Sequence, residues 1–213
     1  MNIEALKLEG SFAIERGSGW YEGFPYPLQD VRALIDVQDE AFVIQSFQAK
    51  GSEGSSVSIA GRVGTAGGSV DVELKLNVTD APLDRALRDA VPKPVATVMD
   101  RLLDRDALEG MQLKGLVGED FELGGFVNMY LSISHGGKEG DSVRVSGDLD
   151  FKDTNVLHSG FPCPISVSAC KIRLEPDKLE IPDDQPILFV GPGGGFGEIR
   201  GTINFDREGN TQP

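Results

Sequence analysis

Apolar and polar residues alternate along much of this chain. The clearest case is residues 70–78, where one parity carries Val70, Val72, Leu74, Leu76 and Val78 and the other carries Asp71, Glu73, Lys75 and Asn77. A period of two places successive side chains on opposite faces of a strand, so each such segment predicts a half-buried β-strand. The predicted strands cover residues 6–14, 31–37, 42–49, 56–63, 69–79, 113–117, 121–134, 142–151, 167–174, 178–181, 187–190 and 197–205.

The hydrophobic period changes after residue 80. Apolar residues then recur every three or four positions over 83–90 and 95–103, with Pro92 and Pro94 between the two segments. This spacing predicts a pair of short helices, and Asp80 is a plausible N-cap for the first of them. Together with the strands, it predicts a mainly β fold in which long amphipathic antiparallel strands form a curled, groove-like or sandwich sheet with a short helical pair inserted.

The sequence also contains an internal repeat without gaps. A shift of 137 positions aligns seven identical pairs, which are Gly10 with Gly147, Gly23 with Gly160, Phe24 with Phe161, Pro25 with Pro162, Pro27 with Pro164, Ile35 with Ile172 and Ile44 with Ile181. Apolar positions between them coincide as well, and the motif Phe-Pro-x-Pro, which we interpret as a turn, occurs in both copies. A unit that occurs twice and stacks on its own copy favours an elongated protein.

The repeat divides the chain into four parts. We predict a first β-repeat unit at 1–80, a helical insert at 81–110, connecting strands at 111–141 and a second β-repeat unit at 142–213. The first residues lack the basic and apolar regions of a signal peptide, the last residues, 207–213, are polar, and no apolar run approaches the roughly 20 residues of a transmembrane helix. We therefore expect a piece of a longer protein that does not itself insert into a membrane.

Charge limits the possible partners. The 213 residues contain 20 Lys and Arg against 34 Asp and Glu, a formal net charge of −14. Because such a chain is repelled by phosphate groups, we expect no nucleic-acid partner and no anionic membrane surface as a partner. A solvated surface that keeps a β-rich chain soluble is the simpler explanation of the charge.

The residues that could carry chemistry form no convincing catalytic or metal site. The glycine loop 191–197 precedes a predicted strand and lacks the Lys and Ser/Thr of a phosphate-binding loop, so it predicts a turn. His135 and His158 are isolated, and Cys163 and Cys170 would lie roughly 23 Å apart on an extended strand, too far for a disulfide. Carboxylates such as Asp148, Asp150 and Asp153 read as solvated acids near turns. We expect no metal, no cofactor and no enzymatic activity.

Several segments resemble the AsmA-like and TamB-like bacterial envelope proteins. The resemblance lies in residues 6–12, 26–35, 59–63 and 78–87, the last being a long strand followed by Pro82 and a short Leu-Asp-rich helix. It covers most of residues 5–90 and, through the repeat, 142–205. It implies a β-sheet curled into an open groove, apolar inside and polar outside, in the periplasm or cell envelope, through which lipids are thought to pass between membranes.

Two functional hypotheses follow, and they differ in whether the apolar faces stay open. In the first, the chain is a non-catalytic groove segment whose partners are lipid or another apolar ligand and adjacent repeats of the same chain. The predicted lipid-lining residues are Leu74, Leu76, Val78, Phe126, Val127, Met129 and Leu131, and the helices at 83–103 would cover an opening or an edge. In the second, the chain is a structural or protein-binding β-module with a closed core and no ligand. An enzyme that gathers acids from distant turns ranks third.

Overall fold

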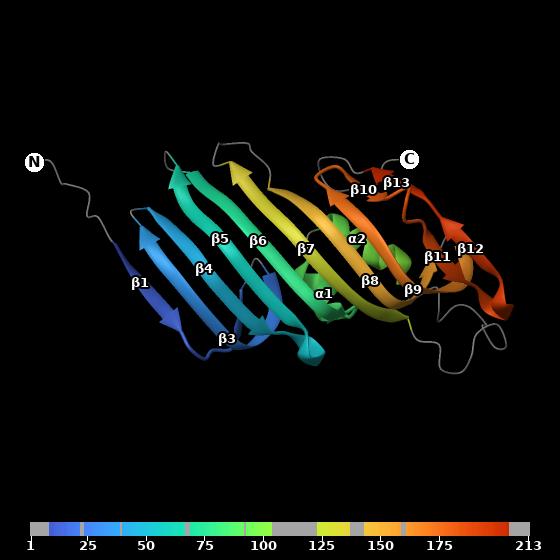
Figure 1. Ribbon diagram of the computed structural model, residues 1–213, viewed down its shortest axis with the longest axis horizontal. Coiled ribbons are helices and arrows are strands. Elements are labelled where there is room, and N and C mark those ends of the chain that lie inside the picture. Colours follow the sequence, from blue (N-terminus) through green and yellow to red (C-terminus); the bar gives the residue numbers. More distant parts are fainter. Residues whose placement is uncertain are drawn as a thin grey trace, which may run out of the picture.

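A computed structural model of the chain describes residues 9–21, 24–38, 40–66, 69–91, 93–103, 123–136, 143–158 and 161–204. Within these residues a single sheet of 13 antiparallel strands dominates the fold, and two short helices lie against one of its faces (Figure 1). The predicted mainly β class, with long antiparallel strands and a short helical pair, is confirmed. The strand predicted at 113–117 lies outside the described residues.

The strands follow one another across the sheet almost in chain order, β1-β3-β4-β5-β6-β7-β8-β9-β10-β13, while β2 pairs with β3, and β11 with β9 and β12. The described ends of this path, β1 and β13, do not pair with each other. The strands are β1 (Glu9–Ile14), β2 (Gly19–Tyr21), β3 (Phe24–Gln38), β4 (Ala41–Lys50), β5 (Ser56–Ala66), β6 (Ser69–Pro82), β7 (Gly124–Gly136), β8 (Arg144–His158), β9 (Phe161–Glu175), β10 (Lys178–Ile181), β11 (Ile187–Val190), β12 (Phe196–Ile199) and β13 (Gly201–Asn204).

Three aspartates mark irregularities in the long strands. Asp30, Asp80 and Asp153 have φ angles of 49°, 53° and 47°, and the pairing register of β3, β6 and β8 shifts beside each of them. Such β-bulges bend a strand, and Asp tolerates this left-handed conformation better than most residues. At the second bulge, Asp80 donates its backbone N–H to Asn128 Oδ1 at 2.8 Å and its carboxylate lies 2.8 Å from Lys152 Nζ. The bulge is thus tied to the next strand, β7, and to β8 beyond it.

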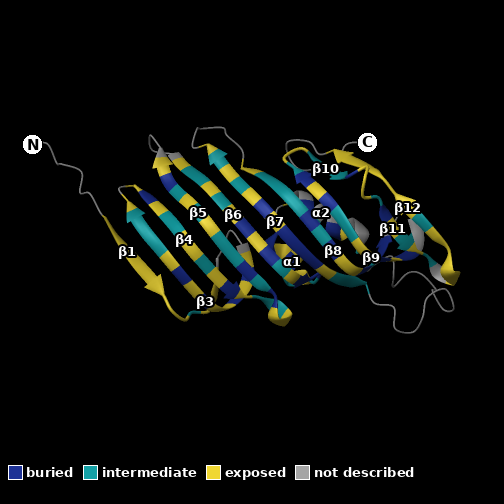
Figure 2. Ribbon diagram, viewed as in Figure 1, coloured by how far each residue is buried: buried dark blue, intermediate teal, exposed yellow. Residues whose placement is uncertain are grey.

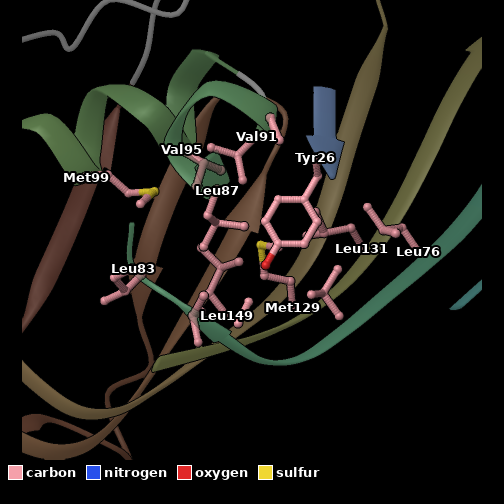
Figure 3. Close-up of a cluster of buried hydrophobic side chains, with 14 of the residues drawn as sticks. Tyr26, Leu76, Leu83, Leu87, Val91, Val95, Met99, Met129, Leu131 and Leu149 are labelled. Atoms are coloured by element: carbon pink, nitrogen blue, oxygen red, sulfur yellow. The ribbon is translucent and has the colours of Figure 1, made fainter. Parts of the chain in front are cut away.

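The helices pack on what we call the inner face of the sheet. Helix α1 (Arg85–Ala90) begins at Asp84, whose side chain accepts a hydrogen bond from Leu87 N at 2.7 Å, and α2 (Lys93–Leu102) is joined to α1 by an ion pair of 2.7 Å between Arg88 and Asp100. Leu87 is fully buried among side chains of β6, β7 and β8, and Tyr26 from the first part of β3 enters the same cluster (Figure 3). The Tyr26 hydroxyl lies 3.1 Å from Ser55 Oγ. The core therefore has a lid made of α1, α2 and the first part of β3.

Strand pairing repeats at the same 137-residue spacing as the sequence. Phe12 pairs with Ile35 in β1 and β3, and Leu149 pairs with Ile172 in β8 and β9. The next strands agree as well, because the pair Val37 and Phe42 corresponds to the pair Leu174 and Leu179. Strands β1, β3 and β4 thus correspond in register to β8, β9 and β10. The division of the chain into four parts stays a prediction.

Three local predictions were wrong. The Phe-Pro-x-Pro motif opens strands β3 and β9 instead of forming a turn, because proline is tolerated in the first residues of a strand. Asp80 lies within β6, and Asp84 caps the helix, because the strand continues to Pro82. The first strand was expected to be half-buried, yet every described residue of β1 is exposed (Figure 2), since β1 lies at the edge of the sheet beyond the lid.

A glycine substitution tests the close approach of β7 and β8. Gly147 has a φ of 149°, and a Cβ added to it would overlap the carbonyl oxygen of Tyr130. We expect Gly147→Ala to lower the free energy of unfolding by about 2–3 kcal/mol, measured by chemical denaturation. The control is Gly10→Ala at the matching position of β1, where an added Cβ meets nothing within 4 Å; it should change stability by less than about 0.5 kcal/mol. Equal effects at both positions would contradict the interpretation.

A second substitution tests the lid. Truncating the fully buried Leu87 to Ala removes apolar contacts between α1 and the sheet, and we expect a loss of about 2–5 kcal/mol in thermal or chemical unfolding. Leu34→Ala, at a side chain that is 44% exposed, serves as the control and should cost under about 1 kcal/mol. A small effect at Leu87 would show that α1 adds little to the core.

Candidate functional site

The inner face carries a row of apolar side chains that crosses seven strands. Residues directly opposite each other in antiparallel strands point to the same face, so the pairing register identifies the members of a row. One row runs from β1 to β8 through Phe12, Ile35, Ile44, Gly61, Leu74, Ile133 and Val145. The neighbouring row runs from β1 to β7 through Gly10, Val37, Phe42, Val63, Val72 and His135.

These two rows, which we call the open strip, lie beside the lid, and Ile133 and Val145 at one end of the strip pack against the covered core. All of their residues are exposed or half-buried, and Phe12 and Phe42 retain 45% and 49% of their accessible surface. His135 is the only ionisable member, and its Nδ1 has no hydrogen-bond partner among the described residues. The open strip is therefore an almost uncharged apolar surface on a chain of high negative charge.

The next rows of the inner face are closed by the lid. Val57, Leu76, Val78, Met129 and Leu149 are all at most 6% exposed and pack with Tyr26, Leu83 and Leu87 (Figure 3). Buried residues are concentrated here on β6–β9, whereas β1 is exposed along its length (Figure 2). The inner face is thus half closed core and half open strip.

The seven predicted lipid-lining residues fall in three different environments. Leu74 belongs to the open strip, and Leu76, Val78, Val127, Met129 and Leu131 belong to the closed core. Phe126 pairs with Lys152, lies on the opposite face from Val127 and is 38% exposed. Alternation identified the inner face correctly for six of them, but it contains no information on where a lid will lie. For the same reason, the alternating pattern alone did not indicate which other inner-face residues would stay open.

A small cavity lies in the closed half beneath α2. It measures about 80 Å³, and apolar side chains dominate its lining, among them Met99, Leu149, Phe151, Cys170 and Ile172. Small-molecule pockets usually measure roughly 300–1,000 Å³. A ligand of that size does not fit beneath α2 in this conformation. The open strip is therefore the remaining candidate surface on the apolar face.

The outer face is polar. A row of paired residues there contains Arg32, Gln48, Ser58 and Asn77, and on β8 and β9 the carboxylates of Asp148 and Asp150 lie 3.9 and 3.6 Å from Lys171 Nζ. These two acids are in a strand and paired with a cation, although sequence analysis placed them near turns. An open hollow of about 630 Å³ on this side is lined by Arg16, Arg32 and Lys50 with Asp30 and several uncharged polar residues. The sheet thus separates a polar face from an apolar one.

The candidate chemical motifs do not converge on a site in the described part of the chain. The glycine loop at 191–197 forms the turn between β11 and β12, where Gly191 N donates to Gly195 O at 2.7 Å. In the described ranges, no group of three or more His, Cys, Asp or Glu residues is placed to hold a metal ion. No described helix has the length and apolar character needed to cross a bilayer.

Comparisons of the chain with protein-family models, with curated proteins and with solved structures find no match. The resemblance to AsmA-like and TamB-like proteins therefore rests on the sequence segments alone.

Cys170 gives a probe of the closed half. Burial raises the pKa of its thiol to about 12, so at pH 8 only about one thiol in 10⁴ is ionised, and the thiolate is the reactive form. In a Cys163→Ser variant we expect alkylation of native Cys170 to be slow and to rise about tenfold per pH unit from pH 7 to 10. The same variant in denaturant should instead begin to level off above pH 9, because the ordinary pKa of a cysteine thiol is 9.0. A native profile that levels off in the same range would contradict the burial.

Proposed function

We propose that this chain is a non-catalytic segment of a cell-envelope β-groove protein that shields or conducts lipid acyl chains between membranes. The observation that carries the proposal is the open strip, a continuous apolar surface on the inner face of an open sheet. Contiguous exposed apolar surfaces mark binding sites more often than other parts of a protein surface do. The resemblance to envelope proteins supports the location in the periplasm or envelope.

The dimensions of the open strip suit an acyl chain. Seven strands spaced about 4.8 Å apart give a strip roughly 29 Å long across the sheet. An acyl chain spans about half of the roughly 30 Å hydrocarbon core of a bilayer, or about 15 Å. One chain therefore fits along the strip with length to spare, which leaves room for it to move.

The chemistry of the strip favours sliding over tight binding. Burial of each CH₂ group contributes up to about 0.8 kcal/mol, and a strip that covers one side of the chain supplies only a part of that. Most positions in the two rows carry Ile, Val, Leu or Phe side chains, so successive positions along the strip offer similar contacts except at Gly10, Gly61 and His135. A ligand would meet neither a deep trap nor a charged barrier.

The alternative is a structural or protein-binding β-module with a closed core. The lid favours this function, because it buries five of the seven residues predicted to line a groove. In that case the open strip would be the contact surface for another protein. The two functions differ in what occupies the strip, and a lipid-binding measurement separates them.

The test uses a charge in the open strip. Phe42→Asp places a carboxylate on the inner face at a half-exposed position, and we expect it to weaken binding of a fluorescent fatty acid of 16–18 carbons at least tenfold, about 1.4 kcal/mol, measured by titration. Leu34→Asp is the matched control, because Leu34 is similarly exposed, at 44%, but lies outside the two rows of the strip. It should change the affinity less than about twofold.

Thermal melts of both variants establish that the fold is retained. Mass spectrometry of lipids extracted from the purified wild-type chain identifies any natural occupant. Absence of saturable fatty-acid binding by the wild type, or equal losses in the two variants, would refute lipid binding at the strip and favour the protein-binding module.

A further inference from the structure

Three glycines within the sheet lie where a neighbouring strand approaches too closely for a side chain. A Cβ on Gly61 would overlap the carbonyl oxygen of Glu73, and a Cβ on Gly147 would overlap that of Tyr130. At Gly125 it would lie 2.7 Å from the carbonyl oxygen of Asp153. Their φ angles are 141° for Gly61, 133° for Gly125 and 149° for Gly147, a range that residues with an L side chain rarely adopt. In these positions glycine is required by the next strand.

Gly10 occupies the position in β1 that Gly147 occupies in β8. Gly10 pairs with Val37 as Gly147 pairs with Leu174, 137 residues further along in both strands. The difference is on the other side of the strand. Gly147 faces β7, with Leu131 directly opposite, whereas no described strand lies beyond β1 and a Cβ on Gly10 would meet nothing within 4 Å. Gly10 also lacks the positive φ of Gly147. Within the described residues, both the close approach and the backbone conformation that require a glycine at Gly147 are therefore missing at Gly10.

The far edge of the sheet shows a related arrangement, in which the two glycines also share their φ angle. Gly201 in β13 pairs with Ile181 as Gly61 in β5 pairs with Ile44, and the φ angles of the two glycines are 140° and 141°. A Cβ on Gly61 would overlap β6, but a Cβ on Gly201 would meet nothing within 4 Å. Each outer strand thus carries a glycine at a position where its interior counterpart needs one.

In the described part of the chain, strand β1 also lacks the features that protect free edges. Natural edge strands are commonly shielded by lysine, proline, a bulge or a covering segment. The sequence Glu-Gly-Ser-Phe-Ala-Ile of β1 has one charge and no lysine or proline, and all six of its pairs with β3 are in continuous register. Phe12 and Ile14 on this edge are 45% and 37% exposed. Among the residues that the structure describes, no strand pairs with this edge, which carries exposed apolar side chains.

From these observations we propose that the free edge of β1 binds an antiparallel strand of a partner polypeptide, in the register that β7 adopts on β8. In this register the partner places an apolar side chain opposite Gly10, as Leu131 lies opposite Gly147, and another opposite Phe12, as Met129 lies opposite Leu149. The partner strand has apolar residues at alternate positions. A second copy of this chain cannot supply β7 itself, because its β7 is held between its own β6 and β8. The proposal is independent of lipid binding.

The first test offers the β7 sequence as a separate peptide. A fluorescently labelled peptide of residues 124–136 is titrated against the full chain and followed by anisotropy. We expect saturable binding to the wild type and at least tenfold weaker binding to Gly10→Ala, because a strand docked as β7 docks on β8 requires at Gly10 the φ near 149° of Gly147, which alanine rarely adopts. The stability of Gly10→Ala should equal that of the wild type, which separates loss of the edge from loss of the fold.

The second test fixes the register by disulfide cross-linking. Ser11 corresponds to Asp148, which pairs with Tyr130, so Ser11→Cys should cross-link to a peptide carrying cysteine at position 130 under mild oxidation. A peptide with cysteine at position 128 is the control, since it would lie opposite Ala13, about 7 Å further along the strand. Mass spectrometry of the digested product locates the bond.

Three results would overturn the proposal. They are no saturable binding of the peptide to the wild type, equal affinity for wild type and Gly10→Ala, and equal cross-linking at positions 128 and 130. Sedimentation of the chain without peptide tests a fourth outcome. Dimers that dissociate on Ser11→Pro substitution would show that the edge binds a second copy of β1 and not a β7-like strand, and would also overturn the proposal.

Discussion

A single open sheet must cover at least one of its faces, and in this protein the cover reaches only half of that face. The lid of α1, α2 and the first part of β3 closes the inner face over β6 to β9, where the side chains are buried as in any globular core. The remaining half is equally apolar, yet it stays open to solvent. Core and open strip are therefore one continuous surface, distinguished only by the reach of the lid.

The lid depends on the bends in the strands. Without the bulge at Asp30, β3 would continue straight and Tyr26 would leave the core. The bulge at Asp80 has a similar role at the other side of the lid, because the end of β6 leads into α1 and Leu83 N donates to Gly125 O at 2.8 Å. Side chains at irregular positions thus determine how much of a regular sheet is covered.

The sequence predicted what depends on neighbours along the chain and missed what depends on distant contacts. Alternation located nearly all the described strands, and the change of period located both helices. The internal repeat anticipated a spacing that the register later showed. In contrast, nothing in the alternation of Leu74, Leu76 and Val78 distinguishes the exposed end of a strand from the end beneath a lid. Left-handed aspartates within strands and a proline-rich strand entry also run against local preferences, because tertiary packing outweighs them there.

Tyr26 illustrates a consequence for the order in which the protein is made and folded. Its fully buried ring shares a cluster with Met129 and Leu131, roughly one hundred residues later in the chain. The first strands can form hairpins as soon as they leave the ribosome, but their apolar face cannot close until β7 has been synthesised. For that interval the nascent chain exposes a broad apolar sheet. Whether the incomplete chain avoids aggregation then depends on the speed of synthesis and on chaperones that bind exposed apolar surfaces, and less on the stability of the finished fold.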